Sequence, residues 1–299
     1  MRRRFHTLDV FTDHALTGNP LAVVLDGEGL DDAAMQAIAR EFTLAETVFV
    51  REPKNPVNTA ALRIFTPSRE LPFAGHPTDG AAVRLAHLRE PEMLKAQDLR
   101  IVLEEKVGDV VCVARHRKGQ AMAAYFTLPR LPESVGDAPP AALLAEGLGL
   151  DVGDIGFGAH RPTVLSAGTP FVFAPLKNLD AMARAKASLR LWGENNTPAV
   201  FLYTDEVVHE TSSFHARMFA SGWGIYEDPA TGGAAAAFAG VLMQFARPPD
   251  GEAMFVIEQG LEMGRPSLIS LGLVVEQGAL VSATIGGSAV IVSQGTIDL

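Results

Sequence analysis

Arg63-Ile64-Phe65 returns in the second half of the chain as Arg217-Met218-Phe219, 154 residues later. At the same spacing, Ile101-Val102-Leu103-Glu104-Glu105 is matched within Met254–Gln259. In each half a glycine-rich break and a run of small residues separate the two stretches. This internal similarity predicts two α/β units of about 150 residues, each with a helix that begins at the equivalent place. A site between two such helix N-termini would suit an anion.

Composition narrows the class of protein. The chain has 299 residues, 47% of them hydrophobic, and a net charge of −10 without a stripe of Lys and Arg, which argues against a nucleic-acid partner. Its one cysteine, Cys112, excludes a disulfide framework and a Cys-based metal cluster and is expected to be buried in a strand. The basic start has no apolar segment after it, and no run of about 18 apolar residues occurs. We therefore expect a soluble, cytoplasmic protein without a membrane segment.

Hydrophobic periodicity predicts a similar order of elements in both halves. In the first half we expect strands at 5–11, 21–25, 44–50, 60–66, 99–104 and 109–114, and helices that begin at Asp31-Asp32 and at Gly75. In the second half we expect strands at 171–174, 199–204, 214–219, 254–259, 267–275, 279–285 and 289–292, and helices at 179–187 and from Gly232 to before Arg247.

These elements predict an α+β fold. The four prolines of 129–140 suggest a linker between the units. Short connections favour largely antiparallel mixed sheets around a helix over a doubly wound parallel sheet. No Rossmann glycine motif, P-loop, HExxH or GxSxG is present, which removes the commonest nucleotide-binding, zinc-protease and serine-hydrolase interpretations.

Three residues could carry chemistry. Glu46 interrupts the apolar strand 44–50, and burial would raise the pKa of such a carboxyl toward neutrality, where it can both take and give a proton. An exposed place at a sheet edge is the open alternative. The residue at the equivalent place in the second half is Val200, so the fold does not require an acid there.

His76 stands at the start of the helix that begins at Gly75, where the helix dipole disfavours a charged imidazole. It could donate a hydrogen bond or pass a proton, or it could simply cap or pack. Asp228 with Pro229 could form an N-cap and N1 pair, or it could lie at the rim of the same cleft. Arg63 and Arg217 are expected to have structural or ion-pair roles because they are repeated.

Several motifs stand in the order of one known family. The chain is identified as similar to the PhzF family of phenazine-biosynthesis-like isomerases, and the resemblance extends from about Asp9 to about Pro266. It is carried by Gly18-Asn19-Pro20, Glu46-Thr47, Phe73-Ala74-Gly75-His76-Pro77, Glu227-Asp228-Pro229-Ala230-Thr231-Gly232 and Gln259–Pro266.

The resemblance implies the diaminopimelate-epimerase fold, in which two pseudo-symmetric domains each wrap a curled sheet around a central helix. The expected domains are 1–122, completed by 287–299, and 123–286. It also implies a homodimer, an active site in the interdomain cleft, and neither a cofactor nor a metal.

The resemblance further implies that Glu46 is the acid/base residue, with His76 and Asp228 beside it. The related epimerases use two cysteines, which would fall near Ala74 and Thr231, so two-thiol racemisation is excluded here. One residue departs from the family pattern, since Gly233 stands where a serine is usual. The substrate-binding residues expected are Gly18, Asn19, Gly75, Pro77, Thr231, Gly232, Gly233 and Ala234.

The resulting hypothesis is a cofactor-independent isomerase that moves a proton between carbons of a small carboxylic acid. Main-chain N–H groups at the two helix starts would bind the carboxylate, although Pro77 supplies no donor. A protein of the same fold that binds a small carboxylate but has lost the chemistry is the main alternative. A hydrolase that uses His76, Asp228 and Ser221 is a third option without a supporting motif.

Overall fold

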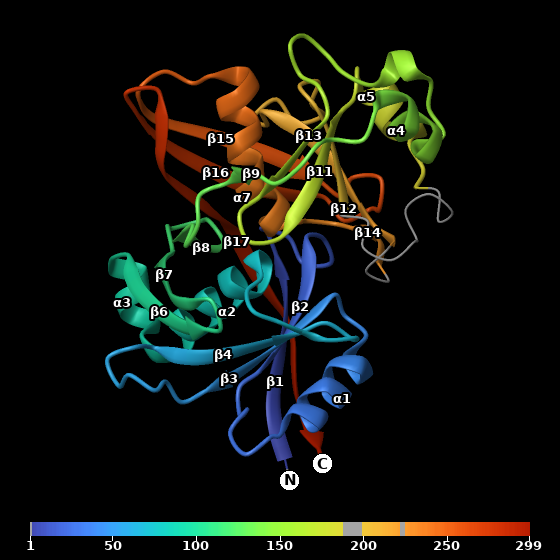
Figure 1. Cartoon of the computed structure of the whole chain (residues 1–299). Helices are drawn as coiled ribbons and strands as arrows, with labels where there is room; N and C mark the ends of the chain where they lie inside the picture. Colours follow the sequence, from blue (N-terminus) through green and yellow to red (C-terminus); the bar gives the residue numbers. More distant parts are fainter. Residues whose placement is uncertain (1, 188–198, 222–224) are drawn as a thin grey trace. The chain divides into compact units, whose positions relative to one another are not determined.

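The computed structural model describes residues 2–187, 199–221 and 225–299 (Figure 1). The chain folds into two compact units. Unit 1 consists of Met1–Pro129 and Gly286–Leu299, and unit 2 consists of Arg130–Ile285. Among the helices of the described residues, none combines the length and the apolar composition that crossing a bilayer requires.

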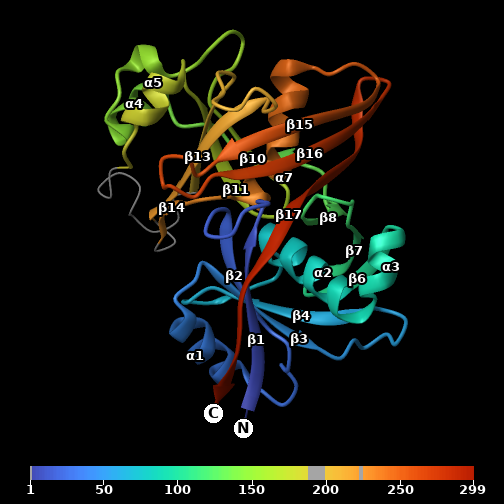
Figure 2. The same cartoon turned by 180° about the vertical axis from the view of Figure 1, so that it is seen from behind.

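Unit 1 is a mixed sheet with three helices. Its elements are β1 (Arg2–Val10), β2 (Asn19–Val24), α1 (Asp32–Phe42), β3 (Glu46–Arg51), β4 (Ala60–Phe65), β5 (Glu70–Leu71), α2 (Gly75–Arg89), α3 (Pro91–Ala96), β6 (Leu99–Glu105), β7 (Gly108–Arg115), β8 (Met122–Thr127) and the C-terminal part of β17 (Ala279–Asp298). β1 pairs antiparallel with β17, with Arg2 opposite Asp298, so the two ends of the chain lie side by side (Figures 1 and 2).

Helix α2 is the most buried helix segment of unit 1. Each of its first twelve residues, Gly75–Ala86, is buried. The helix packs against β1, β2, β6, β7 and β8. Small residues allow this close approach, since a Cβ on Gly80 would lie 2.5 Å from Leu21 Cδ2. A helical stretch that is buried throughout must be covered by other elements, and these strands cover it.

The predicted amphipathic helix is confirmed as α1. Asp31 is its N-cap and accepts a hydrogen bond from the N–H of Ala34 at 2.8 Å. Met35 and Ile38 are buried on one side of the helix, and Phe42 makes an edge-to-face contact with Phe5 at 5.0 Å between ring centroids. These apolar residues therefore hold α1 against the sheet of unit 1.

Unit 2 contains the other strands of the 17-stranded mixed sheet that the described residues form. Its elements are β9 (Glu133–Ser134), α4 (Ala141–Leu148), a 3-10 turn (Val152–Asp154), β10 (Thr163–Ser166), β11 (Pro170–Pro175), α5 (Leu179–Arg184), β12 (Ala199–Thr204), β13 (Phe214–Ala220), β14 (Ile225–Asp228), α7 (Gly232–Val241) with a π-helical turn (Leu242–Ala246), β15 (Gly251–Gln259), β16 (Ser267–Glu276) and the first part of β17.

The strand pairing of unit 2 repeats that of unit 1. β2–β3 and β4–β6 are parallel in unit 1, and β11–β12 and β13–β15 are parallel in unit 2. The antiparallel pairs β3–β4 and β6–β7 correspond to β12–β13 and β15–β16. In unit 2 the buried helix is α7, whose Phe238 contacts the rings of Tyr203 and Phe214 at 4.8 and 5.1 Å.

Some predicted boundaries were wrong. The expected strands 279–285 and 289–292 form one strand, β17, because Gly286 does not break it: a Cβ there would clash with Ala124 O, so glycine permits close approach to β8. The first unit extends to Pro129 rather than to residue 122, because β8 pairs with β7. Helix α5 ends at Arg184 rather than at Ala187, and α3 and α4 were not expected.

Candidate active site

Glu46 and His76 are brought together in unit 1. Glu46 is the first residue of β3, opposite Leu21 of β2, and His76 is the second residue of α2. His76 Nδ1 lies 3.4 Å from Glu46 Oε2, and the two side chains are 7% and 15% exposed. The strand was expected to begin at Leu44, but it begins at Glu46. Glu46 is therefore its first residue and does not interrupt it. The expected alternative of an exposed sheet-edge carboxylate is therefore wrong.

The imidazole of His76 is neutral. Burial lowers the pKa of His76 to about 3, because a charged ring would lose its hydration there. A neutral ring has one nitrogen that donates and one that accepts. The pair therefore places the carboxyl of Glu46 beside a neutral hydrogen-bond donor, an arrangement that suits acid/base catalysis.

The N-terminus of α2 follows directly from the glycine-rich break. Ala74 is the N-cap residue and makes no side-chain capping bond. The first N–H groups of a helix have no partner within the helix and can serve an anion. Gly75 and His76 supply such groups, whereas Pro77 has no N–H to give. The chain thus places main-chain donors next to the Glu46–His76 pair.

Gly18 and Asn19 lie at the turn that leads into β2. Gly18 has φ +64°, and a Cβ there would come 2.5 Å from Val10 O, so the turn itself requires glycine. Asn19 is completely buried and is the first residue of β2, opposite Val10. β2 therefore begins at Asn19 and not at Leu21 as expected, and the backbone conformation and packing here explain why Gly18 and Asn19 occur together.

Asp228 is not the N-cap of α7. Thr231 has that position, and its hydroxyl donates to Asp228 Oδ2 at 2.6 Å. Gln259 ties the same segment together, since its Nε2 donates to Asp228 O at 2.7 Å and its Oε1 accepts from Thr231 N at 3.1 Å. Asp228 is buried and acts on the residue that caps the helix.

The first residues of α7 are Gly232, Gly233 and Ala234. A Cβ on Gly233 would meet the ring of Phe171 at 3.7 Å, which is an ordinary contact. Gly233 therefore has room for a side chain. The N–H groups of the first turn of α7 have no partner within the helix and are accessible to a ligand. In unit 2 the structure thus brings together Asp228, Thr231 and the start of α7.

Two predicted roles are settled by local contacts. Arg63 forms an ion pair with Glu70 and Arg217 one with Glu227, as expected for structural arginines.

Ser221 Oγ makes no hydrogen bond within the described part of the chain, so no base activates it and the hydrolase option has no support. In residues 2–187, 199–221 and 225–299 no group of three or more His, Cys, Asp or Glu side chains could hold a metal ion.

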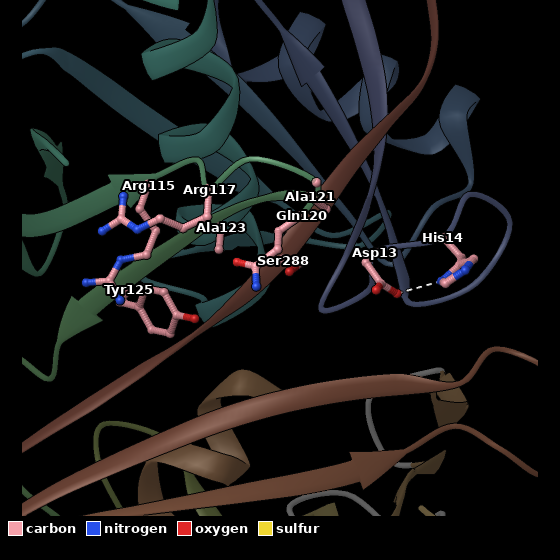
Figure 3. A pocket seen from close by; sticks show the side chains of 10 residues that line it. Asp13, His14, Arg115, Arg117, Gln120, Ala121, Ala123, Tyr125 and Ser288 are labelled. Atoms are coloured by element: carbon pink, nitrogen blue, oxygen red, sulfur yellow. Dashed lines mark hydrogen bonds and ion pairs between the residues drawn. The ribbon is translucent and has the colours of Figure 1, made fainter. Parts of the chain in front are cut away.

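A pocket of about 570 Å³ lies elsewhere in unit 1 (Figure 3). Arg115, Arg117 and Tyr125 are at one end and the hydrogen-bonded Asp13 and His14 at the other. It includes none of the predicted site residues. Both guanidinium groups are already paired with Asp98, at 3.2 and 2.7 Å, so the pocket has little uncompensated charge to offer an anion.

Sequence reasoning missed three residues next to these helix starts: Thr78, Glu105 and Gln259. Thr78 Oγ1 lies 2.7 Å from Glu105 Oε1, and Gln259 binds Thr231 as described above. A signal was present, since the repeat aligns Glu105 with Gln259. Glu105 stands at the buried end of an apolar strand, and an amide replaces it in the other half. Such a match indicates a position that favours a neutral polar side chain.

Comparison with known proteins identifies the family of the chain. A family model described as phenazine biosynthesis-like protein matches residues 8–295. An uncharacterised isomerase of Mesorhizobium japonicum is 48% identical over 99% of this chain and 98% of its own length. A trans-2,3-dihydro-3-hydroxyanthranilate isomerase of Pseudomonas fluorescens is 32% identical over 98% of both chains. The crystal structure of a PhzF-family phenazine biosynthesis protein of Bacillus anthracis superposes with a TM-score of 0.88, at 27% identity and with 100% of both chains covered.

Proposed function

Because this chain belongs to the PhzF family of phenazine biosynthesis-like proteins and is an isomerase, we propose that it moves a proton between carbons of a small carboxylic acid without a cofactor. The observation that supports this mechanism is the buried Glu46–His76 pair, which joins two elements far apart in the sequence. In the proposed reaction Glu46 takes a proton from one carbon and returns it to another, so that a double bond shifts. His76, held neutral, orients the substrate and assists the transfer.

The substrate is proposed to bind through its carboxylate. The proposed donors are the main-chain N–H groups of Gly75 and His76, at the start of α2, because this helix start carries one member of the catalytic pair. A relative from Pseudomonas fluorescens bears the name trans-2,3-dihydro-3-hydroxyanthranilate isomerase. That cyclic carboxylic acid is therefore the first compound to assay.

The contribution of unit 2 stays a prediction. It assigns Asp228, Thr231 and the N–H groups of Gly232, Gly233 and Ala234 to the substrate, with Gly18 and Asn19 from unit 1. Asp228→Asn removes the negative charge and keeps the shape of the side chain. We expect a loss in kcat/KM without loss of the helix cap, because the remaining amide oxygen can still accept from Thr231.

Glu46→Gln tests the mechanism most directly. The variant should fold normally and lose about 10² to 10⁴ in turnover, because an amide can neither take nor return the proton. Proton NMR in deuterated water follows both product formation and deuterium incorporation into the substrate. Glu41→Gln, at an exposed carboxylate of α1, is the matched control and should leave turnover unchanged.

Two outcomes would decide against the proposal. Full activity of Glu46→Gln on a compound that the native protein converts would exclude Glu46 as the proton carrier. A native protein that binds small carboxylic acids but exchanges no carbon-bound proton would support the alternative of a carboxylate-binding protein. The predicted homodimer is a separate expectation, which sedimentation equilibrium measures.

A further inference from the structure

Two carboxyl groups lie buried beneath the first turns of α2, and the proposed reaction uses neither. Asp79 of α2 is 0% exposed and Glu105 of β6 is 9% exposed. Within the described residues, neither oxygen of Asp79 and not the Oε2 of Glu105 has a hydrogen-bond partner. A carboxylate left in this state would carry the full cost of losing its water. The pair therefore needs an explanation.

The hydroxyl of Thr78 lies within hydrogen-bond distance of two oxygens, which favours a protonated Glu105. Thr78 Oγ1 lies 2.7 Å from Ala74 O and 2.7 Å from Glu105 Oε1. A hydroxyl has one hydrogen to donate, and the carbonyl of Ala74 can only accept. If Thr78 donates to Ala74, the contact with Glu105 needs a hydrogen from Glu105 itself. Only the protonated carboxylic acid supplies one.

Unit 2 has a neutral amide at the place that Glu105 occupies in unit 1. The repeat places Gln259 where unit 1 has Glu105, and the two helix starts place Ala236 where unit 1 has Asp79. Gln259 Nε2 donates to Thr231 Oγ1 at 3.1 Å, and Thr231 donates onward to Asp228. A protonated glutamic acid has the shape and the donor–acceptor pair of glutamine. Protonated Glu105 can thus offer Thr78 a hydroxyl donor, as Gln259 offers Thr231 its amide. The two threonines stand at different places, since Thr231 is the N-cap of α7 and Thr78 is the fourth residue of α2.

The surroundings of the pair favour the neutral state. Burial raises the pKa of Glu105 to about 8, and burial together with the neighbouring Glu105 raises the pKa of Asp79 well above its usual value. Cys112 of β7, itself made less acidic by burial, is close enough for Asp79 and Glu105 to raise its pKa further, and apolar Val10 and Leu21 of β1 and β2 lie against the adjacent Gly80. Among the other elements packed against α2, β3 has Glu46 beside His76, and Phe126 of β8 and Leu94 of α3 are buried apolar residues.

No cation compensates the pair among these neighbours. The next basic side chain along α2, Arg84, approaches His6 of β1, with Arg84 Nη2 3.5 Å from His6 Nε2. An ionised Asp79 or Glu105 would thus stand without a counter-ion in an apolar setting, directly below the turn that carries His76.

We propose that Glu105 and Asp79 are neutral carboxylic acids that hold the first turn of α2 in position, and that their ionisation in alkaline solution moves His76 away from Glu46. Glu105 is then a positioning residue that acts through Thr78 and the helix. The effect on catalysis rests on the proposed function, whereas the neutral state of the pair does not.

The sign of the pH effect follows from where the protons are bound. In the unfolded chain both carboxyls lose their protons near pH 4, whereas in the folded protein Glu105 holds its proton up to about pH 8. The folded state binds more protons in this window, so the stability contributed by the pair falls as pH rises from about 4 through about 8. Variants without the ionisable groups should lose this dependence.

Infrared spectroscopy of the native protein tests the neutral state without any substitution. A carbonyl band of protonated carboxylic acid should be present at pH 7 and should disappear well above pH 8. The band should weaken in Glu105→Gln and be absent in the double variant Asp79→Ala with Glu105→Gln, which copies unit 2. Absence of the band from the native protein at pH 7 would overturn the proposal.

Melting temperature as a function of pH tests the energetic part. Glu105→Gln should match the native protein at pH 5 and melt about 2 to 4 °C or more above it at pH 8.5. Glu104→Gln is the matched control at the adjacent residue, whose ionised carboxylate accepts the N–H groups of Lys54 and Asn55. It should melt below the native protein at both pH values. His215, whose pKa the carboxylates of Glu258 and Glu262 raise to about 9 despite burial, is present in all variants. Its effect on the melting temperature therefore cancels in the comparison.

Asp79→Ala gives a second reading if Glu105→Gln fails to fold, because unit 2 has alanine at that place. It should also gain melting temperature at alkaline pH. Melting curves of both variants that run parallel to the native curve from pH 5 to 9 would refute the proposal.

NMR of the His76 imidazole tests the positioning role. The pKa of His76 is about 3, so its own titration is complete below pH 5 and any later change in its signals reports its neighbours. We expect these signals to move between pH 6 and 9 in the native protein and to stay constant in Glu105→Gln. The alkaline fall in kcat/KM should move to higher pH in the same variant, with kcat at pH 6 kept within about twofold.

The possible failures are distinguishable. If the His76 signals move as expected but Glu46→Gln keeps full activity, the proposed function fails and the buried acid pair stands. If the His76 signals of the native protein and of Glu105→Gln behave alike, the positioning role is refuted, whatever the activity shows.

Discussion

Glu104 of unit 1 and Glu258 of unit 2 occupy equivalent places and bind equivalent loops. Glu104 accepts the N–H groups of Lys54 and Asn55 at 2.8 and 2.7 Å. Glu258 accepts those of Val208 and His209 at 2.6 and 2.9 Å. All three pairs are separated by the 154 residues of the sequence repeat. The repeat thus preserves hydrogen bonds atom by atom, which shows that these glutamates maintain the fold.

The arginines repeat in the same way. Arg63 lies over the ring of Phe65 at 5.3 Å, and Arg217 lies over Phe219 at 4.8 Å. Their acidic partners, Glu70 and Glu227, both lie on the short strand that follows. Residues that match between the units are therefore structural.

The differences between the units gather at the start of the buried helix. Glu46 faces Val200 in the alignment, and His76 faces Gly233. Glu105 and Asp79 face Gln259 and Ala236. The proposals assign proton transfer and its pH dependence to these four residues of unit 1. Each of them differs from the residue at the equivalent place in unit 2. A duplicated fold needs its matched residues for stability and is free to change the rest.

The largest effect expected from this asymmetry is on turnover. His76→Asn should lower kcat by about 10² to 10⁴, because the neutral ring that assists Glu46 is lost. His87→Asn, on the exposed last turn of the same helix, is the control and should change nothing. Steady-state kinetics with a converted substrate measures both variants. Equal kinetics for the two would remove the distinction between the helix start and the rest of α2.

The second effect concerns the matched glutamates. Glu258 is 0% exposed and is bonded to His215, whose pKa the carboxylates of Glu258 and Glu262 raise to about 9 despite burial. Glu258→Gln should lower the free energy of unfolding of unit 2 by about 3 kcal/mol, because a buried imidazolium loses a charged partner. Glu104→Gln should cost less, since Glu104 is partly exposed to solvent.

The pH dependence sharpens this test. Although burial opposes it, the bond from His215 and the backbone N–H groups hold the pKa of Glu258 at about 2, below its unfolded value. Its stabilisation is therefore present above about pH 4.5 and is lost as pH falls toward about 2. The deficit of Glu258→Gln in urea denaturation should shrink over the same range. A deficit that stays constant with pH would mean that shape, not charge, matters at this place.

A smaller difference is expected between the two arginines. Arg217 is 7% exposed and donates to Met182 O and Ala185 O as well as to Glu227. Arg217→Lys should cost about 2 to 3 kcal/mol, because lysine cannot make the bidentate bond and the carbonyl contacts together. Arg63→Lys should cost about 1 kcal/mol, since the Arg63 side chain is more accessible. Chemical denaturation of both variants measures the order, and the reverse order would contradict the comparison.

The smallest effect is expected at the start of α7. Gly233→Ser should change stability by less than about 0.5 kcal/mol, because its Cβ would only touch the ring of Phe171. Gly80→Ser on α2 is the opposite case and should cost about 1 to 3 kcal/mol, because its Cβ would lie 2.5 Å from Leu21. Thermal melting of both variants measures the contrast. A large loss at Gly233 would show that its backbone, not its lack of a side chain, is constrained.

Much of the fold could be predicted from local sequence. The strand 199–204 and the start of α2 at Gly75 were placed correctly, because periodicity and glycine breaks are local signals. The continuous strand β17 was not, because Gly286 permits a contact with β8, more than 150 residues away in the chain. Local patterns do not contain such contacts.

The candidate site divides in the same manner. Glu46 and His76 were identified by residue type and family motif, but only folding brings Nδ1 to 3.4 Å from the carboxylate. Asp228 was expected either to cap a helix or to lie at the rim of the cleft; it does not cap α7, which begins at Gly232 as expected, and instead binds the threonine at the N-cap. Thr78 and Glu105 were passed over, since a threonine and a glutamate at element ends are ordinary by themselves.

The sequence by itself determined the repeat, the family and the two helix starts, because these depend on the order and spacing of residues along one chain. Only the tertiary structure decided which carboxyls are neutral and which histidine is uncharged. Protonation depends on how completely water is excluded from a group and on which partners replace it. Those partners of His76, Asp79 and Glu105 come from strands and helices that are distant in sequence, and packing alone assembles them.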